Sequence, residues 1–116
     1  MLFDTHAHYD DEAFDPDREL LLEFSGEMDH HGARNALKEV EIAIDAALPR
    51  SLILDFAGVT FMDSSGIGLI MGRYRAMGMR KESIRATGVS RHIDRLLHLS
   101  GLHRYIEIQT AEEEKA

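Results

Sequence analysis

Residues 52–75 read LILDFAGVTFMDSSGIGLIMGRYR and contain the clearest strand-to-helix pattern of the chain. It opens with a short, almost continuous apolar run, Leu52–Phe56, which is typical of a strand buried on both faces. The small polar cluster Asp63-Ser64-Ser65-Gly66 follows, and an apolar helical pattern begins directly after it. A buried strand that leads through a polar turn into a helix predicts one unit of an α/β sheet. The helix face predicted from this pattern consists of Ile67, Ile70, Met71, Tyr74 and Met77.

The N-terminal side of this stretch predicts a second unit of the same kind. Residues 20–24 alternate between apolar and polar and indicate a half-buried strand, which residues 25–27 should end. Asp29 is placed to cap an amphipathic helix, because its carboxylate can accept amide hydrogens of the first turn. Pro49 should stop that helix.

The C-terminal side predicts further alternation of strand and helix. Residues 83–88 indicate a strand, Ser90 is placed to cap a third helix, and residues 105–108 indicate a last strand. With connections this short, the whole order predicts a single α/β domain. We expect a mixed, mostly parallel sheet of four to five strands with amphipathic helices.

Composition limits the class of protein. The chain has 116 residues, enough for one domain, and it has no cysteine, which excludes disulfides, zinc–thiolate sites and cysteine nucleophiles. We find no apolar run of the roughly 20 residues that cross a bilayer and no signal-peptide pattern. We therefore expect a soluble cytoplasmic protein that does not associate with membranes.

Charge argues against one class of partner and favours another. The net charge of −8 opposes nucleic-acid binding, which needs a basic face. The charge is uneven, because residues 1–63 carry a net −11 and residues 64–116 a net +3. This asymmetry is either the ordinary charge of solvated helix faces or a surface suited to a protein partner.

The polar cluster at residues 63–66 has three interpretations. It can simply cap the following helix. It can belong to a serine hydrolase, but the G-x-S-x-G elbow is absent because Met62 and Asp63 stand where its leading glycine should be. Thirdly, Ser64 can accept a phosphate, whose charge of about −1.5 to −2 is favoured at a helix N-terminus. Asp63 would repel that charge, so the effect would fall on partner binding rather than on the fold.

Several motifs together resemble a known family. FMDSSGIG at 61–68, GEMDHH at 26–31, GVS at 88–90 and LSGL at 99–102 stand in the order and spacing of the STAS-domain anti-sigma factor antagonists. The match is closest to the sporulation (SpoIIAA-like) type. The resemblance covers residues 20–109 and implies a STAS-type domain there, with residues 110–116 as an acidic tail.

The resemblance implies a switch protein without catalytic activity or cofactor. Unphosphorylated members bind an anti-sigma factor that is also a serine kinase, which frees the sigma factor. The kinase phosphorylates the first serine of D-S-S-G, which makes Ser64 the phosphoacceptor, and a PP2C-type phosphatase resets the switch. The other positions implied in partner binding are Asp29, Met62, Asp63, Ser65 and Gly66. The alternative is a STAS interaction module outside sigma-factor control.

The N-terminal segment resembles a different family. MLFDTHAHYDDEAFDPDREL, residues 1–20, is similar to the start of TatD-type metal-dependent hydrolases, in which His6 and His8 would be metal ligands. The remaining ligands of that family belong to a barrel of about 250 residues, which this chain is too short to form. A metal-dependent hydrolase that uses His6 and His8 is therefore a second alternative function, less favoured than the STAS interaction module. We expect residues 1–19 to be an atypical segment that can supply an edge strand, and we expect no metal site.

Overall fold

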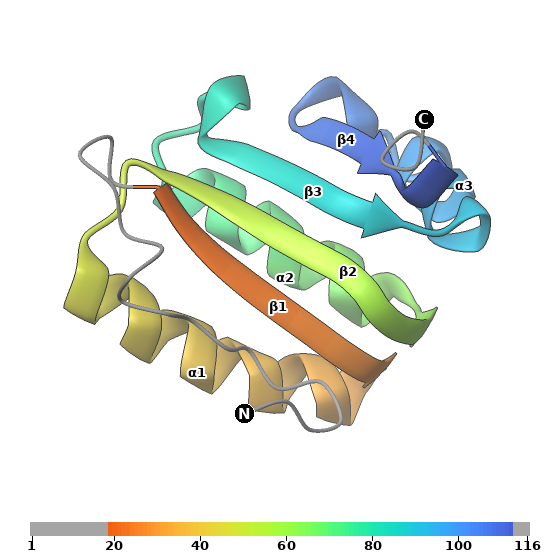
Figure 1. Ribbon diagram of the computed structural model, residues 1–116, viewed down its shortest axis with the longest axis horizontal. Helices are drawn as coiled ribbons and strands as arrows, with labels where there is room; N and C mark the ends of the chain where they lie inside the picture. The colour runs from red at the N-terminus through yellow and green to blue at the C-terminus, as the bar shows by residue number, and fades with distance from the viewer. Residues whose placement is uncertain (1–18, 113–116) are drawn as a thin grey trace.

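The computed structural model describes residues 19–112, in which parallel strands alternate with helices (Figure 1). The elements in chain order are β1 (Glu19–Met28), α1 (His30–Ala47), β2 (Ser51–Met62), α2 (Ser64–Ala76), the 3₁₀ turn η2 (Lys81–Ser83), β3 (Ile84–Val89), α3 (Arg91–Leu99), the 3₁₀ turn η3 (Leu102–Arg104) and β4 (Glu107–Thr110). The predicted order of helices and strands is confirmed.

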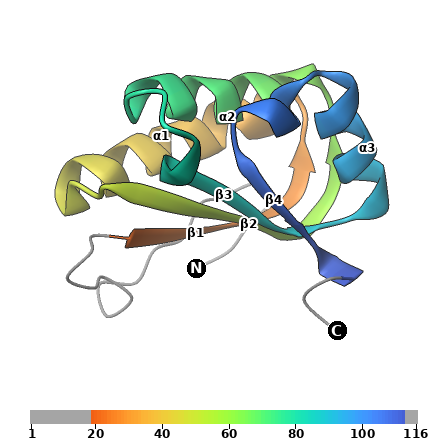
Figure 2. The same ribbon diagram turned by 90° about the horizontal axis from the view of Figure 1, so that it is seen from above.

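The sheet of the described residues has four strands in the order β1-β2-β3-β4. Every neighbouring pair is parallel, so the predicted α/β class is confirmed. Because each crossover between parallel strands is right-handed and steps in the same direction, the helices gather on one face of the sheet (Figure 2). The edge strand expected from residues 1–19 lies outside the described residues, apart from Glu19.

The core lies between the sheet and these helices. Alternate side chains of the strands point into it, and Phe24 of β1 stacks on Phe56 of β2 with ring centroids 5.2 Å apart. The predicted burial of residues 52–56 on both faces is wrong, because Ile53 and Asp55 on the other face are only half-buried. Since the three α-helices cover one face, buried and half-buried side chains alternate along residues 19–24 of β1 and residues 51–56 of β2.

Two strands continue further than predicted. Residues 25–27 do not end β1, because the strand stays paired with β2 and runs on to Met28. The register shifts twice in this region, each time with one extra residue on β2, and Gly26 has a φ of 82° there. β2 likewise extends to Met62, well beyond Phe56. The last strand begins later than predicted, because Tyr105 closes the η3 turn and β4 starts at Glu107.

The ends of α1 follow the prediction. The carboxylate of Asp29 accepts a hydrogen bond from the Gly32 amide (2.8 Å), and the chain leaves the helix at Leu48 in a left-handed conformation (φ 49°) just before Pro49. α1 has 18 residues. Nowhere in the part of the chain that the structure describes is a helix both long and apolar enough to cross a membrane.

Candidate functional site

The carboxyl edge of the sheet carries a row of helix caps. Each of β1, β2 and β3 ends one residue before a cap, and each cap side chain accepts a hydrogen bond from an amide of the next helix. The caps are Asp29, Asp63 and Ser90. Because parallel strands end at the same edge, loops distant in sequence meet there, as they do in other α/β sheets that bind ligands or partners.

Asp63 is held by hydrogen bonds on both sides. Its carboxylate accepts from the Ser65 amide at 2.8 Å, and its carbonyl accepts from the amides of Gly66 (3.0 Å) and Ile67 (3.4 Å). Its own amide donates to the carbonyl of Met28 at the end of β1 (3.4 Å). The start of α2 is therefore anchored to the ends of β1 and β2, and this fixes the position of the serine that follows.

The two serines differ in access. Ser64 is the first residue of α2 and is exposed, and no described side chain or backbone group within residues 19–112 hydrogen-bonds to its hydroxyl. Ser65 is half-buried, and its amide donates a hydrogen bond to the Asp63 carboxylate. Of the pair, Ser64 is the more accessible to a second protein.

Two residues expected to bind a partner lie beneath the surface instead. Met62 is only 2% exposed, and Gly66 is buried. A Cβ atom at Gly66 would stand 2.5 Å from Cγ of Met62 and 2.8 Å from Cγ of Met28. Glycine is therefore needed here for the first turn of α2 to rest on the two methionines. Both residues can influence a partner only by supporting the loop above them.

Sequence reasoning missed an exposed aromatic ring beside this site. Phe61 is 41% exposed and lies across from Glu27 in the β1–β2 pair. The signal for it was the alternation along a strand, because buried Met62 puts Phe61 on the opposite face. Large exposed aromatic side chains are common anchors of protein interfaces.

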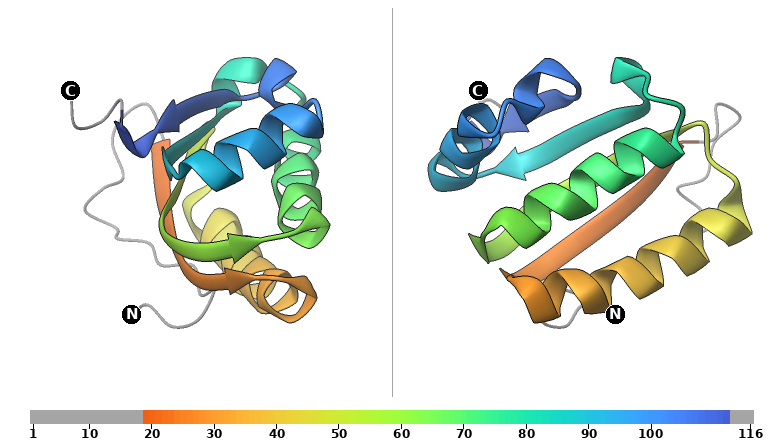
Figure 3. Two further views of the ribbon diagram at one scale, coloured as in Figure 1. Left: turned by 90° about the vertical axis from the view of Figure 1, so that its right-hand side faces the viewer. Right: turned by 180° about the vertical axis from the view of Figure 1, so that it is seen from behind.

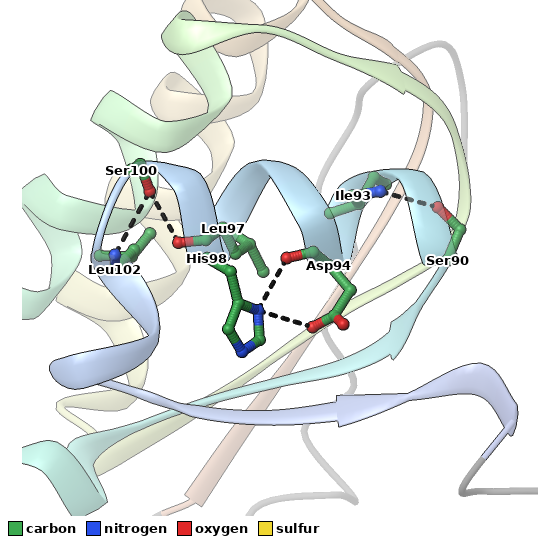
Figure 4. A network of polar contacts seen from close by, with 7 residues as sticks. All are labelled: Ser90, Ile93, Asp94, Leu97, His98, Ser100 and Leu102. Atoms are coloured by element: carbon green, nitrogen blue, oxygen red, sulfur yellow. Dashed lines mark hydrogen bonds and ion pairs between the residues drawn. The ribbon is translucent and has the colours of Figure 1, made fainter.

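A separate polar network supports the C-terminal helix (Figure 4). The ring Nδ1 of His98 lies 2.9 Å from the Asp94 carbonyl and 3.3 Å from its carboxylate, and Ser90 caps the helix through the Ile93 amide (3.2 Å). The His98 ring also stacks on His103, with centroids 4.3 Å apart. This network connects α3 to η3 and is a structural element of that corner.

The two histidines that would be metal ligands in the alternative hydrolase function are His6 and His8, and both lie outside the described residues. Among residues 19–112 no group of three or more histidine, aspartate or glutamate side chains is arranged to hold a metal ion.

Comparisons with known proteins agree on one family. The family described as STAS domain matches residues 12–115. An anti-sigma F factor antagonist from Paenibacillus polymyxa is 33% identical over 89 residues, which cover 77% of this chain and 76% of that protein. An anti-sigma-B factor antagonist from Listeria monocytogenes is 28% identical over 92 residues, which cover 78% of each chain.

Solved structures show the same similarity. The unphosphorylated form of the anti-sigma factor antagonist SpoIIAA superposes with a TM-score of 0.70 at 25% identity, covering 93% of this chain and 91% of that one. The phosphorylated form of SpoIIAA from Bacillus gives 0.64 at 25% identity, covering 93% and 95%.

Proposed function

This chain belongs to the STAS-domain family, among the anti-sigma factor antagonists, and we propose that it is a binding switch whose phosphoacceptor is Ser64. With Ser64 unmodified, it binds an anti-sigma factor that is also a serine kinase, and the sigma factor is released. With Ser64 phosphorylated, it releases the kinase. The observation that carries this proposal is the exposed Ser64 hydroxyl on a firmly anchored helix start.

The chemistry requires no catalytic group from this chain. The Ser64 oxygen attacks the γ-phosphorus of ATP held by the kinase, the bond from that phosphorus to the bridging oxygen of ADP breaks, and the hydroxyl proton passes to a base of the kinase. A PP2C-type phosphatase later hydrolyses the phosphoester. The proposal thus places the chain in the cytoplasm as a substrate and ligand of other proteins, with no cofactor, nucleic acid or membrane.

The position of Ser64 explains why phosphate would alter binding and leave the fold intact. A helix N-terminus favours negative charge, so the new phosphate does not oppose α2. The Asp63 carboxylate stays bound to the Ser65 amide and repels the phosphate outward, toward the partner. A protein that docked on a neutral hydroxyl then faces about two negative charges.

Asp29, Asp63 and Ser65 form the contact surface around Ser64 in this proposal, with Met62 and Gly66 as its support. The experiment is incubation with the cognate anti-sigma kinase and ATP, followed by mass spectrometry of the intact chain and its peptides. We expect one phosphate, on Ser64, and none on a Ser64→Ala variant, while Ser65→Ala still accepts one. Phosphate on another residue, or none although the complex forms, would contradict the proposal.

A further inference from the structure

A groove of about 430 Å³ runs between α1 and α2 and opens beside the cap of α2. The two helices lie side by side on the same face of the sheet (Figure 3), and Ala33 and Leu37 of α1 with Leu69 of α2 make an apolar floor. Ser65 lines the groove as well. One end of the groove is therefore next to the proposed phosphoacceptor.

Two glycines widen this groove at a cost to the helix. Gly68 and Gly72 both line it, four residues apart on one side of α2. A Cβ atom at either position would meet nothing within 4 Å. Packing inside this chain thus gives no reason for glycine, although glycine weakens a helix interior relative to alanine. The open space suits the close approach of a backbone from outside.

The rim of the groove is positively charged. Arg34 stands on the α1 side and Arg73 on the α2 side, and within residues 19–112 neither forms an ion pair with a carboxylate. The Nε atom of Arg73 is buried and lacks a hydrogen-bond partner among the described residues. That atom is not itself accessible to a partner, but the charge of the partly exposed guanidinium is best matched by a carboxylate.

Beyond its Asp29 cap, α1 carries its charged side chains in an unusual order. The cations Arg34 and Lys38 lie in its first half, while Glu41 and Asp45 lie in its second half. The helix dipole favours the opposite order. Of these four side chains Arg34 lines the groove, where its positive charge complements an acidic partner.

We propose that the groove binds an amphipathic helix of the anti-sigma partner, seating an apolar side chain on the glycines and pairing a carboxylate with Arg34 and Arg73. Residues 30–37 of α1 rise about 10 Å, enough for two turns of such a helix. The inference rests on the proposed function and adds a cause for release. A phosphate on Ser64 at the mouth of the groove would repel the same acidic helix.

The first test measures the affinity of unphosphorylated variants for the cognate anti-sigma factor by calorimetry. Arg73→Glu removes the charge match and Gly72→Leu fills the space, so we expect each to weaken binding at least tenfold. Arg75→Glu and Ala76→Leu, exposed changes on the same helix outside the groove, should stay within about twofold. The thermal transition of each variant shows that it is folded.

The second test uses the absence of cysteine from the chain. A Gly72→Cys variant carrying a photoactivatable maleimide should cross-link to an acidic helical segment of the anti-sigma factor, whereas Leu99→Cys, at an exposed position on α3 away from the groove, should not. Wild-type affinity in both groove variants, or a groove variant that instead changes the oligomeric state of this chain alone, would overturn the inference. If wild type binds and is phosphorylated on Ser64 while the groove variants behave normally, only the groove assignment fails; if wild type neither binds nor is phosphorylated, the proposed function fails with it.

Discussion

The backbone amide of Asp63 donates a hydrogen bond to the carbonyl of Met28 at 3.4 Å. This bond lies just past the last β1–β2 pair, Met28 with Met62, and extends the parallel pairing into the cap of α2. It holds the starts of α1 and α2 beside each other, so that Ser64 is presented by two strands rather than by a free loop. Changes at this junction should therefore register in both stability and binding.

Removing the cap of α2 should lower stability. Asp63→Ala loses the acceptor for the Ser65 amide, and we expect the free energy of unfolding to fall by about 0.5–2 kcal/mol. Asp63→Asn keeps an amide oxygen that caps equally well and should restore most of this loss. Urea denaturation measures both. Equal losses in the two variants would show that the charge, not the hydrogen bond, stabilises the helix start.

Replacing glycines on opposite sides of α2 by alanine should change the free energy of unfolding in opposite directions. In Gly66→Ala the new methyl meets Met62 and Met28 at 2.5 and 2.8 Å, so we expect a loss of about 1–3 kcal/mol from overpacking. In Gly68→Ala nothing lies within 4 Å, and helix propensity should add about 0.5–1 kcal/mol. Chemical denaturation of the two variants provides the comparison. A stabilised Gly66→Ala would mean that the methionines move aside freely.

A negative charge at Ser64 should weaken binding without affecting the fold. Ser64→Asp carries one charge where phosphoserine carries about two, so we expect binding to the anti-sigma factor to weaken roughly tenfold, about 1.4 kcal/mol. The thermal transition should remain nearly unchanged, because Ser64 is exposed at a helix N-terminus. Calorimetry gives both quantities. A large drop in thermal stability instead would favour a purely structural role for this serine.

Two phenylalanines of β2 should separate stability from recognition. Phe56 is fully buried and stacks on Phe24, so Phe56→Ala should cost about 3–5 kcal/mol of unfolding free energy. Phe61 is 41% exposed, and Phe61→Ala should cost less than about 1 kcal/mol while weakening partner binding. Denaturation and titration of both variants distinguish the roles. Unchanged partner affinity in Phe61→Ala would remove this ring from the interface.

Local patterns predicted the order of elements and the starts of their helices. The caps Asp29 and Ser90 were identified because a capping side chain needs only the amides two or three residues ahead. The ends of β1 and β2 were missed because two register shifts, each with an extra residue on β2, interrupt the alternation of buried side chains after Phe56. The end of a strand depends on its pairing with a second strand, so it cannot be predicted from the pattern of one sequence segment alone.

The face of α2 was predicted only in part. Ile70 is fully buried as expected, but Tyr74 is only half-buried, whereas Leu69 and Gly66 are buried outside the predicted face. The buried face of α2 differs from the predicted face because the first turn of the helix packs at Gly66 directly against Met28 and Met62, the last residues of β1 and β2. The groove could not be predicted either, since it depends on α1 and α2 being neighbours in space.

The linear order of the strands has a consequence for biosynthesis. Because each strand of the described sheet pairs only with strands adjacent in the chain, the growing polypeptide can add one strand and helix at a time. The residues proposed to contact the partner, Asp29, Asp63, Ser64 and Ser65, all lie in the chain before α3 and β4. The part of the protein that would meet the kinase can thus form as the chain emerges from the ribosome, before α3 and β4 are added to the sheet.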